Sequence, residues 1–437
     1  MNHPAEELHL GIACSGSTLQ LALVTAGGEV REARVVESSG DLSEDLDIAL
    51  STAPSGVRAI MIATDRLRGA LEGSTPLARV ATLRIGGPAT DGMPVLSSWP
   101  EPLLARLSPI TETVTGTIDS TGRELVPFDE AAAERFFERC RGEVDAVAVS
   151  SMFAPLAPEF ERRAAAIATR VLGDGMSVTM SHAVAGFGLL DRESAATLSA
   201  ALSPIAADML NEIDAAIARH DSDAEVFLVQ NDGTLAVAEV AVATPILLLE
   251  GVTASNLSGT ALLAGVTDAV VLSEEPGRSG FVRDGLVVMT SAPTRVAGIR
   301  LNVELPVEAG PAGPPHDFGA GPMHRLSLDS GAGGQSLPHS EIAAAYGSAL
   351  APVGAIAWMV SEGDEREAQR LHRAKQQVVE LAIMAGADPM TAAVTEIDEI
   401  DISHAKNRRL RILATGRPLL ISRADRSALE LDHSTTH

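Results

Sequence analysis

The sequence predicts an α/β fold, and three observations support this prediction. The chain opens with two β-rich runs, residues 8–14 and 18–24, joined by a short polar turn. Further short apolar runs then alternate with segments of helical periodicity, as in strands that are covered by helices. With 437 residues, of which 46% are hydrophobic, the chain is long enough for two domains with packed cores.

The first third of the chain supplies most of the predicted strands. They are short, largely apolar runs at residues 8–14, 18–24, 30–36, 57–64, 78–85 and 145–151. Residues 128–141 and 158–172 have apolar side chains at helical spacing, and acidic first turns that suit the helix dipole. Residues 114–125 predict a hairpin with its tip at Ser120-Thr121-Gly122.

The second half is predicted to mix long helices with shorter strands. Its elements are a helix over 191–219, a strand over 225–230, a helix near 254–264, a hairpin over 281–289, helices over 341–360 and 364–385, and a strand pair at 395–402 and 408–414. Asp284-Gly285 is a strong turn signal for the hairpin. Residues 307–338 are predicted to be loop, because Gly and Pro at this density oppose both helix and sheet.

Composition excludes several classes of partner. A formal net charge of −25 opposes binding to nucleic acid or to anionic lipid by electrostatic repulsion. Apolar runs such as residues 245–249 are far shorter than the ~20 residues of a membrane helix. The N-terminus has no secretory signal pattern, and the two cysteines cannot form a disulfide framework. A cytoplasmic protein with no nucleic acid and no membrane as partner is therefore expected.

Three sequence blocks carry a resemblance to a known family. They are Ser181-His182, Asp191-Arg192-Glu193 and Gln230-Asn231-Asp232-Gly233-Thr234. On these blocks, and on further matches along nearly the whole chain, the sequence resembles the hydantoinase A/oxoprolinase family as a short and degenerate member. The resemblance implies two actin-like domains of the sugar kinase/heat-shock ATPase type, the second reduced. It also implies ATP-dependent opening of cyclic amides, or carboxylation of ketones in related complexes.

The family's phosphate and metal chemistry is not kept in this chain. Register with the family places its four aspartates at Ala13, Gln20, Ser273 and Gly280. Mg²⁺ prefers oxygen ligands, above all carboxylates and phosphates, so their replacement removes the expected ligands. The second tip also carries Glu274-Glu275, which repel phosphate, and Pro276, which has no N–H group. The alternative is that the two glutamates hold the metal instead.

Several polar residues remain candidates for a site. His182, Asp191, Glu193 and Asp232 are candidate catalytic residues, because the family's inner cleft is lined by these elements. The candidate remnant of a cofactor site consists of Gly16, Ser17, Thr18, Gln230, Asn231 and Gly233. Each has a structural alternative: a buried histidine, capping of a helix start, or an ordinary turn with glycine at positive φ. Histidines are not spaced with cysteine or acid as metal ligands, so no metal site is predicted.

Two functions follow from the resemblance, and whether the chain is an enzyme stays uncertain. The first is a protein that has lost ATP hydrolysis, needs no cofactor, and acts as a non-catalytic subunit or regulatory relative. It is expected to form a homo-oligomer or to bind a related hydantoinase-type subunit. The alternative is an active amidohydrolase that opens a hydantoin or 5-oxoproline-like ring with ATP and Mg²⁺.

The resemblance also suggests how the chain divides into domains. The predicted parts are an N-terminal domain over 1–180, a core domain over 181–306, a Gly/Pro-rich linker over 307–338, the C-terminal part of the core domain over 339–423, and a polar tail over 424–437. Relatives of this type are longer, and register places the missing segment between about Pro306 and Gly333.

Overall fold

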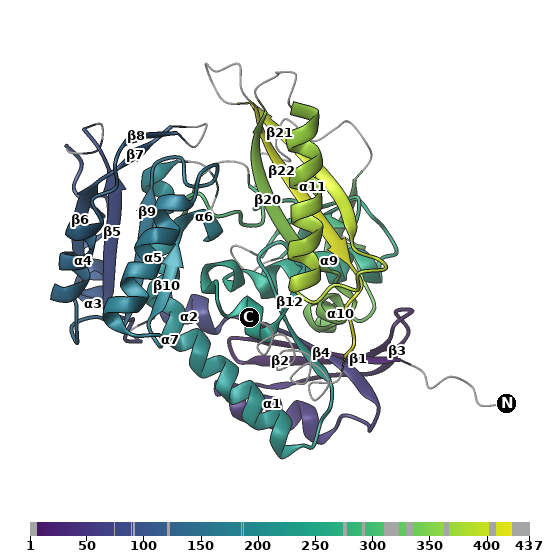
Figure 1. Cartoon of the computed structure of the whole chain (residues 1–437). Coiled ribbons are helices and arrows are strands. Elements are labelled where there is room, and N and C mark those ends of the chain that lie inside the picture. Colours follow the sequence, from purple (N-terminus) through teal and green to yellow (C-terminus); the bar gives the residue numbers. More distant parts are fainter. Residues whose placement is uncertain are drawn as a thin grey trace.

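The protein is a mixed α/β structure with several sheets, as the sequence predicts (Figure 1). The computed structural model describes residues 7–73, 75–88, 90, 92–119, 123–184, 186, 188–273, 278–290, 293–309, 323–328, 335–361, 367–401 and 408–421. Within these residues the strands form one sheet of nine strands, one of five, one of four and two of two.

The nine-stranded sheet joins the two ends of the chain. Its order is β21-β22-β20-β12-β11-β4-β1-β2-β3. These strands are β1 (Leu8–Ser15), β2 (Thr18–Thr25), β3 (Val30–Glu37), β4 (Val57–Thr64), β11 (Glu225–Val229), β12 (Leu235–Val237), β20 (Val353–Ser361), β21 (Ala393–Asp401) and β22 (Arg408–Gly416). The predicted domain limits are therefore crossed by one sheet, whose hydrogen bonds tie the first 64 residues to the last strands.

The five-stranded sheet repeats part of this topology at smaller size. Its strands are β13 (Ala269–Leu272), β14 (Gly280–Arg283), β15 (Leu286–Val287), β18 (His324–Ser327) and β19 (Gln335–Ser336). They lie in the order β15-β14-β13-β18-β19, with the first two pairings antiparallel and the last two parallel. The run β3-β2-β1-β4-β11 has the same senses of pairing in the same order. Two sheets of one topology are thus present, the second with much shorter strands.

The four-stranded sheet is entirely parallel. It consists of β5 (Val80–Gly86), β6 (Ile110–Thr115), β9 (Ala146–Ser151) and β10 (Ser177–Met180), in the order β10-β9-β5-β6. One face packs on α4 (Glu130–Arg139) and α5 (Glu159–Leu172), and the other on the long helix α7 (Leu189–Arg219). Burial on both faces explains why β5 and β9 contain so few charged residues.

Helix α10 (Ala343–Leu350) is held by unusually close backbone packing. It lies between β1 and α9 (Gly251–Leu263). A Cβ at Gly11 of β1 would lie 1.9 Å from the Ala345 carbonyl oxygen, and one at Gly347 would lie 2.2 Å from the Ser255 oxygen. Only glycine fits at these two positions. Because neither residue has a side chain, the backbone of α10 packs directly against β1 and α9.

The remaining elements are short or peripheral. The helices are α1 (Leu42–Ser51), α2 (Arg66–Glu72), α3 (Glu101–Leu107), α6 (Ser181–Val184), α8 (Ala238–Ala241) and α11 (Glu367–Met384), and the two-stranded sheets are β7 (Thr117–Ile118) with β8 (Glu124–Val126) and β16 (Thr294–Val296) with β17 (Ile299–Leu301). Most predicted strands and helices coincide with these elements. Asp284 and Gly285, at φ 51° and 79°, form the predicted hairpin turn. The predicted tip at residues 120–122 lies outside the described residues.

Two predictions of secondary structure were wrong. The helix predicted over 341–360 ends at Leu350, and β20 begins at Val353. Pro352 explains the break, since it forces Ala351 into extended backbone (ψ 142°) and cannot continue a helix. Within the predicted loop 307–338, residues 324–327 form β18, because pairing with β13 supplies the hydrogen bonds that composition opposes.

The apolar stretch Pro245–Leu263 is long enough and apolar enough to cross a membrane. However, 67% of it is buried inside the protein, as in a core helix. The sequence analysis did not recognise the length of this stretch. Few charged residues occur in it, but its apolar residues do not form one continuous run.

Candidate functional site

The tip of the first hairpin opens onto a large cleft. The cleft holds about 2260 Å³ of empty space, open solvent included, and is lined by Ser15, Gly16, Ser17 and Thr18 of the β1–β2 tip. Among the described residues that line it, five are carboxylates and three are arginines: Asp41, Asp45, Asp65, Glu72, Asp208, Arg66, Arg68 and Arg278. An excess of negative charge in a partly enclosed cleft disfavours a polyphosphate.

Arg278 connects the two hairpin tips across this cleft. It lies between β13 and β14, in the tip of the five-stranded sheet. Its guanidinium donates a 2.6 Å hydrogen bond to Asp65 Oδ2 and a 2.7 Å hydrogen bond to Ser15 Oγ. Ser15 Oγ in turn donates to Asp65 Oδ2 at 2.6 Å. Because the side chains of Arg278 and Asp65 are only 10% and 21% exposed, this ion pair is poorly screened by solvent.

The two residues that the sequence analysis placed at the family's first two aspartates face helix α10. Ala13 and Gln20 are directly opposite each other in the β1–β2 ladder. Ala13 is buried, with 1% exposure. Gln20 Oε1 accepts hydrogen bonds from the backbone N–H groups of Ala344 (3.1 Å) and Ala345 (3.4 Å) at the start of α10. The glutamine thus satisfies the free donors of a helix N-terminus, where an anion could otherwise bind.

The other two aspartate positions flank the second tip. The Ser273 N–H donates to Ser279 Oγ at 2.9 Å. A side chain at Gly280 would displace its neighbours, because a Cβ would lie 2.6 Å from Leu257 Cδ1 and 3.2 Å from the Val307 carbonyl oxygen. Glu274, Glu275 and Pro276 lie outside the described residues.

The block at residues 230–234 forms the turn between β11 and β12. Gly233 has φ 82°, and its N–H donates to the Gln230 carbonyl oxygen at 3.0 Å. Asp232 Oδ1 accepts from the Thr234 N–H and hydroxyl groups. Asn231 is buried, and its side chain bonds the backbone at Ile246 and Glu250. These contacts within and beside the turn are those expected from the alternative that treats the block as an ordinary turn.

Asp191 and Glu193 at the start of α7 do not cap the helix with their side chains. Asp191 pairs with Arg300 at 3.2 Å. Glu193 is buried in a two-pronged ion pair with Arg84, at 2.6 and 2.7 Å. It also accepts hydrogen bonds from the Leu96 N–H and the Ser150 hydroxyl. Glu193 therefore ties β5 and β9 to α7, a role that sequence reasoning missed.

His182 forms a buried carboxylate–imidazole pair with Glu161. His182 Nδ1 lies 2.7 Å from Glu161 Oε2, which also accepts from the His182 N–H at 3.0 Å. Glu161 Oε1 accepts from the Ser181 hydroxyl at 2.5 Å and from the Ser151 N–H at 2.8 Å. Glu161 is fully buried, whereas the His182 side chain is 18% exposed. Sequence reasoning did not single out Glu161.

A buried arginine, Arg192, contacts two of the residues that hydrogen-bond to Glu161. Arg192 Nε donates to Ser181 Oγ at 2.8 Å, and its guanidinium also bonds the Ser151 carbonyl oxygen. Burial lowers the pKa of Arg192. The described residues contain no group of three or more metal-ligating side chains, and both cysteines are buried and reduced.

A cluster of carboxylates surrounds Arg411 on β22. Its guanidinium donates to Glu304 and to Glu396, each at 2.7 Å, and lies 3.6 Å from Asp398. Burial raises the pKa of Glu304 to about 7 and also raises that of Glu396, against the opposing effect of Arg411. The positive charge of Arg411 does not balance the negative charges of these three carboxylates. The cluster therefore favours protonation of a carboxylate.

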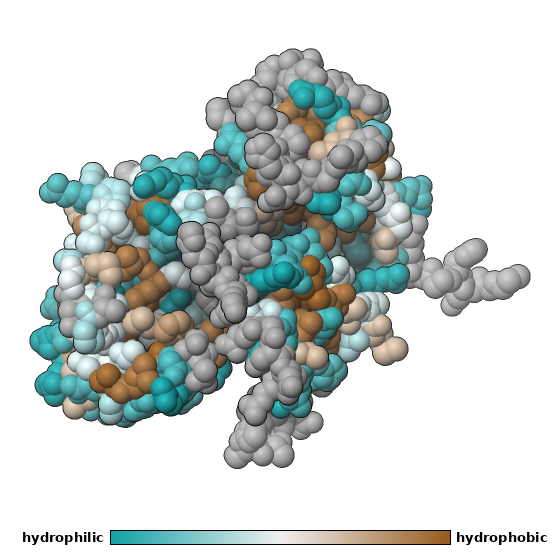
Figure 2. All heavy atoms as spheres, turned by 90° about the horizontal axis from the view of Figure 1, so that it is seen from above, coloured by the Kyte–Doolittle hydropathy of each residue, from teal (hydrophilic) through white to brown (hydrophobic). Residues whose placement is uncertain are grey.

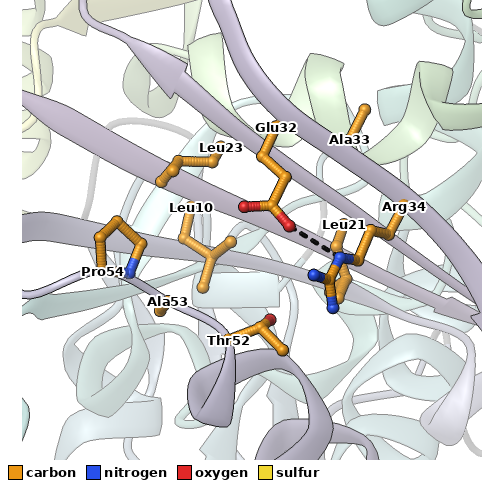
Figure 3. Close-up of a pocket in the computed structure, with 9 residues that line it drawn as sticks. All are labelled: Leu10, Leu21, Leu23, Glu32, Ala33, Arg34, Thr52, Ala53 and Pro54. Atoms are coloured by element: carbon orange, nitrogen blue, oxygen red, sulfur yellow. Dashed lines mark ion pairs between the residues drawn. The ribbon is translucent and has the colours of Figure 1, made fainter.

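A small hollow between the first sheet and the end of α1 carries no chemistry. Figure 3 shows it lined by Leu10, Leu21 and Leu23, with the Glu32–Arg34 ion pair at its edge. Its lining is mostly aliphatic, and it lies away from the residues described above.

Comparisons with known proteins fit this geometry. A family model described as the hydantoinase/oxoprolinase N-terminal region matches residues 41–172. A nucleotide-free structure of acetone carboxylase is similar at a TM-score of 0.66 and 10% identity, over 95% of this chain and 88% of that chain. An ATP-dependent caprolactamase from Pseudomonas jessenii is similar at a TM-score of 0.67 and 15% identity, over 94% and 88%. No curated protein sequence matches the chain.

At these low identities the two structures show a shared fold. Together with the family match at residues 41–172, they support membership of the hydantoinase/oxoprolinase family.

Proposed function

We propose that this chain has two actin-like domains, the second reduced, and that it has lost ATP hydrolysis. The repeated strand order of the nine- and five-stranded sheets supports the architecture, since each sheet contains a run of five strands with two antiparallel pairings followed by two parallel ones. The short strands of the second sheet support its reduction. In this arrangement the two hairpin tips face each other, and the Arg278 contact with Ser15 and Asp65 agrees with that placement.

The proposal rests on the residues that are found at the two hairpin tips. Phosphoryl transfer depends on positioned metal ions and on donors that neutralise the developing charge. At the four positions where register with the family places aspartate, this chain has a buried alanine, a glutamine that caps α10, a serine, and a glycine whose Cβ would displace Leu257. Arg278 already donates hydrogen bonds to two acceptors at the first tip and beside it, Ser15 Oγ and Asp65 Oδ2.

Absence of Mg²⁺-dependent ATP turnover is the direct test. Purified full-length protein should release phosphate from ATP no faster than a heat-inactivated sample. Saturable turnover that disappears in Glu274→Gln or Glu275→Gln would overturn the proposal. It would favour instead the alternative, an ATP-dependent amidohydrolase acting on a hydantoin or 5-oxoproline-like ring, because these glutamates would then hold the metal.

The proposed role is that of a non-catalytic subunit or regulatory relative in the cytoplasm. Association is expected with a second copy or with a related hydantoinase-type subunit, because a reduced domain leaves apolar surface that its relatives cover. Met384 and Met390 are 70% and 90% exposed. On the face shown in Figure 2, separate apolar patches lie among polar atoms. Sedimentation at micromolar concentration decides self-association, and a monomer of the 45.3 kDa chain mass would leave only a different subunit as partner.

A further inference from the structure

The residues at the carboxyl edge of the parallel sheet are distinct from those that line the cleft between the tips. Along the chain, β5 is followed by β6 on one side, and β9 and β10 then lie on the other side of β5. The connections therefore diverge between β5 and β9, and ligands of open α/β sheets bind outside the carboxyl ends of strands at such a point. Ser151 ends β9, and Ser181 and His182 directly follow β10.

The hydrogen bonds of Glu161 fix the orientation of the His182 imidazole. Each carboxylate oxygen of Glu161 accepts two hydrogen bonds. Oε1 accepts from the Ser151 N–H and the Ser181 hydroxyl, and Oε2 accepts from the backbone N–H and the imidazole of His182. A saturated carboxylate accepts and does not donate, so the neutral imidazole carries its proton on Nδ1. Nε2 is then left with its lone pair, on the one member of the group that reaches solvent.

A second polar group at this edge lacks a structural partner. The Ser151 hydroxyl is buried and has no hydrogen-bond partner in the described part of the chain. Buried hydroxyls normally find partners, so an unpaired hydroxyl on a residue whose N–H bonds the carboxylate that orients the imidazole is a candidate contact for a ligand. Glu161 and Arg192 carry opposite charges behind the imidazole, which suits a ligand without net charge.

We infer that His182 is a proton acceptor at this edge, oriented by Glu161, for a small uncharged molecule that offers an N–H or O–H group. His182 Nε2 takes the proton of that group, and the Ser151 hydroxyl bonds the ligand. Glu161 is a positioning residue, since it touches the imidazole and not the ligand. This inference does not depend on the fate of ATP in the cleft.

Hydrolysis of p-nitrophenyl acetate by the full chain, without nucleotide or Mg²⁺, tests the proton transfer. Water oxygen adds to the acetyl carbon, Nε2 takes the water proton, and the bond to p-nitrophenol breaks with its electron pair leaving on the phenolate oxygen. His182→Asn should lower the rate about tenfold or more, because general-base catalysis contributes about 10²–10⁴-fold in enzymes. His220→Asn is the matched control, since His220 also pairs with a carboxylate, Asp47 at 3.0 Å, but lies elsewhere. It should leave the rate unchanged.

Equal rates for wild type and His182→Asn would overturn the inference. The ¹⁵N spectrum of histidine-labelled wild-type protein gives a second test that needs no variant. It should show neutral His182 protonated on Nδ1, and protonation on Nε2 would contradict the proposed orientation. In Glu161→Gln this preference should weaken and the rate should fall, whereas a purely structural role would leave the tautomer of a folded variant unchanged. Because no ATP is present, neither result bears on the loss of ATP hydrolysis.

Discussion

The guanidinium of Arg278 lies 2.6 Å from the carboxylate of Asp65, across the cleft between the two hairpin tips. These residues are 213 positions apart, and the same guanidinium reaches Ser15, 263 positions away. The contact joins the tip of the small sheet to the tip of the large one. An internal cation therefore occupies part of the cleft in which the proposed family register would place Mg²⁺ and phosphate.

Removal of this cation should destabilise the protein. Arg278→Ala leaves Asp65 without its charged partner, and we expect the free energy of unfolding to fall by about 1–3 kcal/mol. Urea denaturation measures it. Arg31→Ala, which breaks the exposed Arg31–Glu29 pair, is the control and should change stability by less than about 0.5 kcal/mol. Equal effects of the two variants would show that the contact between the tips contributes nothing.

The cap that Gln20 provides to α10 predicts a graded effect of substitution. Gln20→Ala leaves two backbone donors without an acceptor and should cost about 1–2 kcal/mol. Gln20→Glu keeps the acceptor and adds a charge that the helix N-terminus favours, so it should retain most of the stability. Thermal melting of both variants is the measurement. A loss in Gln20→Glu as large as that in Gln20→Ala would contradict the capping role.

Restoring the family's aspartates should not restore nucleotide binding. Gly280→Asp places a charged side chain against Leu257, which is fully buried, and overpacking alone costs about 1–3 kcal/mol. Gly69→Ala in α2 is the matched control, because open space surrounds it and helix propensity should stabilise it by about 0.5–1 kcal/mol. The combined variant Ala13→Asp, Gln20→Asp, Ser273→Asp and Gly280→Asp should neither fold well nor bind ATP. Micromolar ATP affinity in this variant would show that the pocket is spared.

Glu304 should make stability depend on pH. Burial raises the pKa of Glu304 from 4.5 to about 7 in the folded protein. Its contribution is therefore fully present below pH 4.5 and is lost as the pH rises through about 7. Relative to Glu304→Gln, wild type should lose up to about 3 kcal/mol across this window. Denaturation of both proteins at several pH values measures this. Glu399→Gln, at an exposed pair with Arg408, is the control. It keeps Glu304 and should lose stability over this window as wild type does, so a pH dependence as flat as that of Glu304→Gln would contradict the assignment.

The sequence predicts the elements of this fold well where each is local. The strands of the first sheet and helices α4, α5, α7 and α11 follow from apolar spacing, because each buries one face or both. The helix predicted over 341–360 was wrong because Ala-rich spacing on both sides of Pro352 outweighed the break. Strand β18 was missed because it lies in a segment rich in Gly and Pro. It is stabilised by pairing with β13, which lies 55 residues earlier in the chain (Ala269 pairs with His324).

The site residues were harder to predict because their partners are distant. The family register identified His182, but Glu161 was treated only as a first-turn acid. A signal was present: Glu161 shares a helical stripe with Ala164, Ala168 and Val171, all buried, so it is an acid on an apolar face. No comparable signal marks Arg278, whose contacts depend on how the two tips meet.

Binding of Mg·ATP to the full chain, measured by isothermal titration calorimetry, tests the central claim most directly. Wild-type protein at low salt should give no saturable heat with ATP at millimolar concentration, because the tip region lacks its aspartates and holds Arg278. Arg278→Ala should give none either, since the charged residues that remain in the cleft are five carboxylates and two arginines. Saturable binding with micromolar affinity, dependent on Mg²⁺ and displaced by ADP, would contradict the account.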